Sequence, residues 1–112
     1  MIYSLDKLNE MAEGDQDFIV SVVSVFLEEV PTDLKAMEKA LVANDHENVY
    51  QLAHKIKPNV DLLGMEQTRA VTLEMETLAK DPTNMPLLKD LFPTLKTDIQ
   101  QVVSELQKDF NI

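Results

Sequence analysis

The chain has 112 residues, a length typical of one domain that can bury a modest core without disulfides or a metal ion. Apolar residues make up 45% of it and there are only two glycines, which favours a compact helical protein over a disordered or β-rich one. Ten basic residues against twenty acidic ones give a formal net charge of -10, which argues against nucleic acid and anionic lipid as partners. The lack of cysteine excludes disulfides and thiol chemistry.

The sequence also predicts the cellular compartment of the protein and its number of domains. No apolar run is long enough to span a membrane, and the first ten residues, MIYSLDKLNE, lack the basic start and apolar stretch of a signal peptide. We therefore expect a cytoplasmic protein with no membrane partner. We find no internal repeat and no linker, and we expect one domain over residues 1–112 that acts as a monomer.

The first predicted element is a short helix that Ser4 can cap and that Gly14 ends. Its apolar positions at helical spacing are Leu5, Leu8 and Met11. A long helix then opens at Asp15, and its apolar residues recur every three or four positions over about seven turns. These residues are Ile19, Val22, Val23, Phe26, Val30, Leu34, Met37 and Leu41. Pro31 lies inside this pattern, and because the apolar phase continues past it, we predict a kink and not a break.

A third helix is predicted between Asp45, which can cap it, and Gly64, which ends it. Its narrow apolar stripe consists of Val49, Leu52, Ala53, Ile56, Val60 and Leu63. A fourth pattern covers residues 66–80. Its inward positions are predicted to be Ala70, Val71, Met75 and Leu78. The segment DPTNMP that follows has the proline and asparagine content of an inter-helix turn.

The last helix is predicted from about Leu87 to Phe110, with a kink at Pro93 near its start. Its inward residues are Leu88, Leu91, Leu95, Ile99, Val102, Leu106 and Phe110. Four amphipathic helices joined by short loops can bury their apolar stripes only against one another. The predicted fold is therefore an all-α, antiparallel four-helix up-and-down bundle, with the additional short N-terminal helix lying across one end.

The third helix carries the candidate functional residue. At about 100° per residue, His54 points about 140° away from the centre of the apolar stripe, toward solvent. Lys57 lies one turn further on the same side, whereas Lys55 lies on the opposite flank. Between Glu47 and Asp61 there is no acidic side chain, so this exposed face is a small cationic island on an acidic protein. The rest of the face consists of Tyr50, Gln51, Pro58 and Asp61.

The chemistry that fits this face is nucleophilic. An exposed neutral imidazole has one nitrogen free to attack phosphorus, and a neighbouring ammonium can neutralise phosphoryl oxygens. Lys57 is the better placed of the two lysines, while Lys55 would contribute a long-range field or meet an acidic surface of a partner. Pro58 cannot donate to the His54 carbonyl and presents only a compact ring, which leaves the approach to the imidazole open. Alternatively, Pro58 only bends the helix to fit the bundle.

The two histidines and the methionines also have simpler explanations. A lone surface histidine is most often an ordinary solvated residue. His46, near Asp45 and Glu47, could join a metal site, but charged residues at a helix start are most simply explained by capping, and we expect no metal site. The methionines, including Met37, Met65 and Met75, are expected mainly at or near core positions and need no ligand to explain them.

The segment LAHKIKPNVDLLGM resembles the signature of histidine-containing phosphotransfer (HPt) domains. In that signature a histidine is followed by Lys at the third position, a small residue at the fourth, and Leu-Gly at the ninth and tenth. The matching residues here are His54, Lys57, Pro58, Leu63 and Gly64. The chain departs from the common pattern at Pro58, where Gly is usual, and at Asn59, where Ser is usual. The resemblance extends over nearly the whole chain, since the family fold is a four-helix bundle with a short N-terminal helix.

The resemblance implies a phosphorelay. A receiver domain of a hybrid histidine kinase or response regulator would dock over His54, transfer its phosphoryl group, and a second receiver would later remove it. The chain would be a phosphoryl carrier and not an enzyme with kinase activity, and Mg²⁺ would belong to the acidic pocket of the receiver. The expected docking surface combines Tyr50, Gln51, Pro58 and Asp61 with Leu8 and Met11 of the first helix, and Gly64 would form a structural turn.

Two rival functions remain open at this point. One is a non-catalytic helical adapter in which His54 is incidental, although an adapter gains nothing from an exposed histidine with a lysine at this spacing. The other is a degenerate HPt domain that docks receivers without carrying phosphate. The presence of both His54 and Lys57 argues against it.

Overall fold

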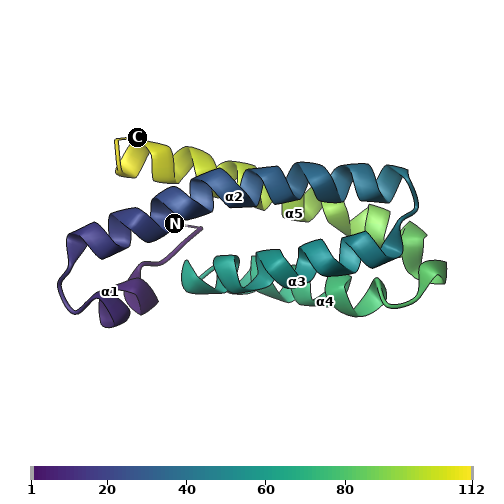
Figure 1. Ribbon diagram of the computed structural model, residues 1–112, viewed down its shortest axis with the longest axis horizontal. Helices are drawn as coiled ribbons and strands as arrows, with labels where there is room; N and C mark the ends of the chain where they lie inside the picture. Colours follow the sequence, from purple (N-terminus) through teal and green to yellow (C-terminus); the bar gives the residue numbers. More distant parts are fainter. Residues whose placement is uncertain (1, 112) are drawn as a thin grey trace.

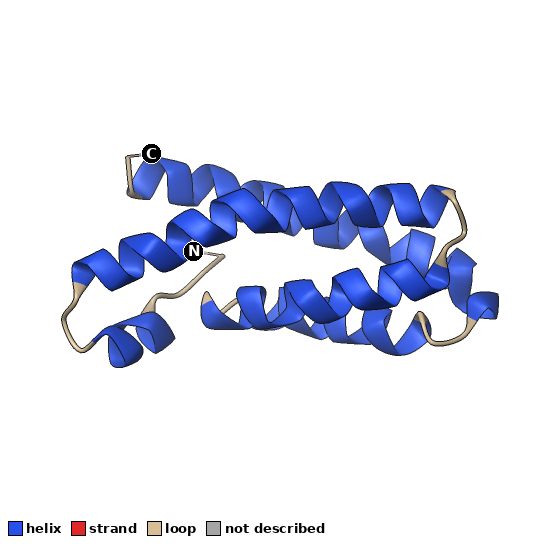
Figure 2. Cartoon of the chain, viewed as in Figure 1, coloured by secondary structure: helices blue, strands red, loops and turns tan. Residues whose placement is uncertain are grey.

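A computed structural model describes residues 2–111, and within that range the chain is helical apart from short connections and contains no strand (Figure 2). The elements are α1 (Asp6–Ala12), α2 (Gln16–Val42), α3 (His46–Leu62), α4 (Glu66–Leu78), the short 3-10 helix η1 (Pro82–Asn84) and α5 (Met85–Asp109). The predicted all-α class is confirmed. Met1 and Ile112, the ends of the expected domain, lie outside the described residues.

The four long helices form an antiparallel bundle in which chain neighbours are also neighbours in space (Figure 1). Helix α2 packs against α3 and α5, and α4 packs against the same two helices from the other side. The apolar stripes predicted for α2, α3 and α5 meet in one continuous core. Two aspartates begin the helices as expected: Asp15 accepts hydrogen bonds from the backbone of Asp17 and Phe18, and Asp45 accepts one from Asn48. None of the described helices is both long and apolar enough to cross a membrane.

Helix α1 lies beneath the N-terminal part of α2, beyond the end of α3 (Figure 1). Ser4 Oγ accepts a hydrogen bond from the Asp6 backbone at 3.3 Å, so it satisfies a first-turn donor although the helix itself begins two residues later. Leu8 is fully buried in the core, whereas Met11 is 58% exposed. The expectation that Leu8 contributes to a docking surface is therefore wrong, because packing of this short helix turns Leu8 inward.

Helix α4 is rotated relative to the prediction. Its buried residues are Thr68, Thr72, Met75 and Glu76, while Ala70, predicted to face inward, is exposed. The polar groups on this inner face find partners: Thr68 Oγ1 donates to Asp98 at 3.1 Å and Thr72 Oγ1 to the Thr68 carbonyl at 2.7 Å. An apolar pattern therefore could not predict which face of this helix is buried.

The proline-containing segments also differ in detail from the prediction. Residues of the predicted turn form η1, and α5 starts at Met85, two residues earlier than expected, with Pro86 in its first turn where a missing N–H costs nothing. Helices α2 and α5 continue through Pro31 and Pro93, so neither proline breaks its helix.

The N-terminal segment is tied to the end of the bundle that holds the α3–α4 turn. The Ser4 amide donates to the Leu63 carbonyl at 2.7 Å, and Gly64, with φ +64, lies so close to Ser4 that an added Cβ would be 2.9 Å from the Ser4 Cβ. Next to Ser4, the Tyr3 hydroxyl donates to a carboxylate oxygen of Asp109. Burial, followed by that carboxylate, raises the pKa of Tyr3 to about 12.

Candidate functional site

His54 lies on the outer face of α3. The inner face of this helix is formed by Val49, Ala53, Ile56 and Val60, all of which are fully buried. His54 lies on the other side of the helix, and its side chain is 63% exposed. The side-chain direction predicted from helical periodicity agrees with the structure.

The His54 ring has a carboxylate partner that the sequence analysis missed. Nδ1 of His54 lies 3.4 Å from Oε2 of Glu76, a residue of α4 that is only 9% exposed. Nothing in the local sequence marks Glu76, because it becomes a neighbour of His54 only through the packing of α4 against α3. The one available signal is its spacing: Glu76 follows Thr68 and Thr72 at four-residue intervals on the buried face of α4.

Lys57 is held by the same carboxylate. Its Nζ donates a hydrogen bond to Oε1 of Glu76 at 3.1 Å and also lies 3.1 Å from Oε2, and its side chain is 25% exposed. In the structure the charge of Lys57 is thus paired with Glu76, and its expected role beside a phosphoryl group stays a prediction. It still lies on the His54 side of α3, since both residues contact one carboxylate.

The contact with Glu76 distinguishes the two ring nitrogens of His54. At 3.4 Å the Nδ1–Oε2 separation is longer than a typical N–H···O hydrogen bond, yet a carboxylate favours a proton on the nitrogen that faces it. In the neutral ring this leaves the lone pair on Nε2. Tyr50, one turn earlier, stacks against the imidazole with ring centroids 6.2 Å apart and planes 11° apart, which restricts the ring further. The arrangement thus presents Nε2 as a nucleophile.

Lys55 points away from this group. Its Nζ donates to Oδ1 of Asp33 on α2 at 3.0 Å, and Asp33 is only 6% exposed. This hydrogen bond is the main cause that raises the pKa of Lys55. The predicted position on the flank opposite Lys57 agrees with the structure, but the grouping of Lys55 with the phosphate-stabilising residues does not, because its ammonium is committed to α2.

The other residues predicted around His54 divide into two groups. Gln51 and Pro58 are exposed, as docking residues should be. Asp61 instead joins three helices: one oxygen lies 2.8 Å from Nζ of Lys7 on α1 and 3.3 Å from Nε of Arg69 on α4. The Lys7 hydrogen bond is the main cause that lowers the pKa of Asp61. Asp61 therefore contributes to holding the bundle end together.

The second histidine has a structural role. His46 Nδ1 lies 2.9 Å from the Ala79 carbonyl, and this contact ties the start of α3 to the end of α4. Among residues 2–111 there is no group of three or more His, Cys, Asp or Glu side chains that could hold a metal ion.

Two hollows are lined in part by residues of α3 that come before and after His54 in the helix. Toward the start of α3, Tyr50 and Gln51 help to line an open hollow of about 410 Å³ together with His46, Glu47, Ala79 and Lys80. Toward the other end, an apolar hollow of about 270 Å³ lies between α2 and α3, and sequence analysis did not foresee it. Its lining residues are Phe18, Ser21, Val22, Val25, Asn59 and Leu62. Leu62 is eight residues from His54, which corresponds to roughly 12 Å along the helix.

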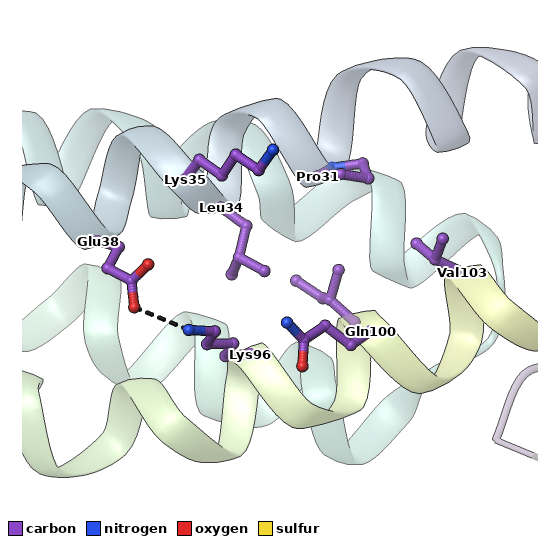
Figure 3. A pocket seen from close by; sticks show the side chains of 8 residues that line it. Pro31, Leu34, Lys35, Glu38, Lys96, Gln100 and Val103 are labelled. Atoms are coloured by element: carbon purple, nitrogen blue, oxygen red, sulfur yellow. Dashed lines mark hydrogen bonds and ion pairs between the residues drawn. The ribbon is translucent and has the colours of Figure 1, made fainter.

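A further hollow belongs to another part of the molecule. It measures about 300 Å³ and lies between α2 and α5, with Leu34 and Ile99 among its lining residues. Lys96 of α5 pairs with Glu38 of α2 beside it at 3.0 Å (Figure 3). No residue of α3 or α4 lines this hollow, so it is separate from the His54 site.

Comparison with known proteins identifies the family. The sequence matches the family model of the Hpt domain over residues 21–105, and the chain therefore belongs to the Hpt domain family. Its fold is similar to the crystal structure of histidine-containing phosphotransfer protein B (HptB) from Pseudomonas aeruginosa PAO1, with a TM-score of 0.82 and 17% sequence identity over 96% of this chain and 93% of that chain. A search of curated protein sequences gave no significant match.

Family membership confirms the resemblance seen in the motif around His54. Hpt domains are phosphocarriers rather than kinases, and they serve histidine phosphotransfer in phosphorelays through contacts with receiver domains. The similarity to HptB, at 17% identity, shows the bundle fold and confirms the predicted architecture.

Proposed function

We propose that His54 accepts a phosphoryl group from the phosphoaspartate of one receiver domain and passes it to an aspartate of another. The observation that carries this proposal is the exposed imidazole on α3 whose Nδ1 faces a buried carboxylate, which leaves Nε2 free to react. Receivers of hybrid histidine kinases and of response regulators are the proposed partners. In this role the chain carries phosphate without kinase activity of its own, as a monomer in the cytoplasm.

The uptake step uses the Nε2 lone pair. Nε2 attacks phosphorus in line with the bond to the receiver aspartate, the P–N bond forms, and the electron pair of the broken P–O bond returns to the aspartate carboxylate. The ring, which still carries its proton on Nδ1, gains positive charge beside Glu76. Lys57 contributes a second charge near the incoming phosphoryl oxygens, since it shares that carboxylate. Mg²⁺ in the acidic pocket of the receiver would neutralise the remaining phosphoryl charge.

The surface around His54 suits a transient partner. In-line transfer requires the receiver to close over the reacting atoms, and a standard interface buries about 800 Å² on each side. A patch of that size centred on His54 includes Gln51 and Pro58 beside it and reaches the apolar hollow with Val25, which is 47% exposed. We propose that this hollow, together with the exposed Met11, supplies the apolar contacts that hold the receiver.

The test is direct labelling. A panel of receiver domains is phosphorylated with radiolabelled acetyl phosphate, and each is incubated with this chain. Transfer of an acid-labile, base-stable label to the wild type is expected with at least one receiver. The His54→Gln variant should take up no label, whereas His46→Gln should be labelled as the wild type is, because His46 only bonds a backbone carbonyl. Undiminished labelling of His54→Gln would refute the assignment.

A further inference from the structure

We propose that the negative charge of Glu76, and not only its capacity to accept a hydrogen bond, controls how readily phosphorylated His54 releases its phosphoryl group. Glu76 would do so by holding a proton on Nδ1 of the phosphorylated ring. This inference rests on the proposed function and assigns Glu76 as a positioning residue, since it touches the nitrogen opposite the reacting one.

The geometry singles out one oxygen of Glu76. Oε1 accepts the hydrogen bond from Lys57 at 3.1 Å, whereas Oε2 is buried, accepts no hydrogen bond from the described residues and has the Lys57 ammonium at 3.1 Å as an ion-pair contact. Oε2 is also the oxygen that lies 3.4 Å from Nδ1 of His54. A positively charged N–H on Nδ1 would give this buried oxygen a second cationic neighbour. A proton on Nδ1 of the phosphorylated ring would therefore face a buried negative charge.

Phosphorylation is the step that creates such a ring. With phosphorus on Nε2 and a proton on Nδ1, the ring is a cation. When a receiver carboxylate attacks phosphorus, the P–N bond breaks, its electron pair returns to Nε2, and His54 leaves as a neutral imidazole that keeps the Nδ1 proton. If Nδ1 has lost its proton, the leaving group is an imidazolate anion, which leaves far less readily. The charge of Glu76 favours the first form and thereby keeps the phosphoryl group transferable at higher pH.

The surroundings of the ring leave Glu76 as the dominant charge. Among residues 2–111, the only acidic side chain in ion-pair contact with His54 is that of Glu76, which lies on α4. On α3 itself, Lys57 partly neutralises that carboxylate and Tyr50 stacks on the ring. On the α2 side, Asp33 and Lys55 are paired with each other.

The experiment needs no receiver. The full chain is phosphorylated with phosphoramidate, and loss of phosphohistidine is followed by phosphorus NMR between about pH 5 and pH 9. Four proteins are compared: the wild type, Glu76→Gln, Lys57→Gln, and the control Glu105→Gln, which changes a partly buried glutamate of α5 that has no contact with His54. Glutamine keeps an acceptor oxygen but removes the charge.

The expected result is a displaced pH profile. In Glu76→Gln the midpoint of the fall in decay rate should move to lower pH by about one unit, a roughly tenfold change in the protonation equilibrium, while Glu105→Gln should match the wild type. Nitrogen NMR of the unphosphorylated ring should also show a larger fraction of the tautomer with the proton on Nε2. Lys57→Gln should move the midpoint to higher pH, because it removes the charge that neutralises Glu76.

Two results would overturn the inference. One is a Glu76→Gln profile that coincides with the wild type in a protein whose circular dichroism shows intact helices. The other is a Lys57→Gln midpoint that stays in place or falls, and this arm decides the question if Glu76→Gln does not fold. Failure of the proposed function has a different signature, since phosphorylated receivers would then leave His54 of the wild type unlabelled while the decay of chemically phosphorylated His54 would still respond to Glu76→Gln.

Discussion

Replacement of Gly64 by alanine should lower the stability of the protein without changing phosphate uptake by His54. Gly64 has φ +64, a conformation that disfavours residues with a Cβ by about 1–2 kcal/mol. An added Cβ would also lie 2.9 Å from the Ser4 side chain, so the N-terminal segment must move. That movement breaks the hydrogen bond from the Ser4 amide to the Leu63 carbonyl, worth about 1 kcal/mol.

The expected loss of stability for Gly64→Ala is about 2 kcal/mol. Alanine also lowers the conformational entropy of the unfolded chain, which stabilises the folded state by about 0.4–1 kcal/mol and offsets part of the strain and the lost hydrogen bond. For a domain of this size, about 2 kcal/mol lowers the melting temperature by roughly 8 °C. Thermal unfolding followed by circular dichroism, with urea unfolding as a second measurement, would give both values. Phosphate uptake by His54 below the transition should be unchanged, because Gly64 lies beyond the end of α3 and makes no contact with the imidazole.

Gly14 supplies the matched control. It also has a positive φ, +91, but an added Cβ would meet nothing within 4 Å. Gly14→Ala should therefore carry the backbone strain alone and lose about 1 kcal/mol, roughly 4 °C in melting temperature. Equal losses in the two variants would refute the reasoning, since the close approach of Ser4 would then contribute nothing.

Two further predictions concern the region around His54. Lys57→Ala should slow phosphoryl transfer by roughly tenfold or more in a labelling time course. Lys55→Ala should transfer the phosphoryl group normally but melt at a lower temperature, because the buried carboxylate of Asp33 on α2 loses its partner. The reverse ranking of the lysines in transfer would contradict the placement of their charges. Val25→Glu should weaken receiver binding by at least tenfold in a titration followed by NMR, and Val42→Glu, which alters a more exposed valine of the same helix at its far end, should not. Equal binding by both variants would show that the receiver does not use the apolar hollow.

The parts of the site that lie on one helix could be predicted from sequence. Helical periodicity determines which residues of α3 face away from the stripe formed by Val49 and Ile56, so the exposure of His54 and the opposite flanks of Lys55 and Lys57 followed from spacing alone. The same reasoning applies to the long apolar patterns of α2 and α5, from which the helical bundle was predicted.

The parts that depend on contacts between helices could not be predicted in this way. Glu76 reaches His54 only because α4 buries a face with Thr68 and Thr72 on it, and a polar face gives no hydrophobic period to read. Leu8 was misplaced for a related reason. In a helix of seven residues, Leu8 and Met11 are separated by less than one turn, and only packing against the bundle decides which of them is buried.

The charged residues beside His54 are anchored to neighbouring helices, and under the proposed function this anchoring would hold the exposed histidine in a fixed position. Lys57 is tied to Glu76 on α4, and Lys55 to Asp33 on α2, so the turn of α3 that carries His54 is held from both sides by ion pairs with buried carboxylates. Pro58 lies in the next turn and cannot donate to the His54 carbonyl, yet α3 continues through it to Leu62. The two ion pairs hold this part of the helix against its neighbours where one backbone hydrogen bond is missing. A nucleophile on a helix turn held in this way would need little reorganisation when a receiver docks. Such preorganisation favours rapid transfer between proteins that meet only briefly.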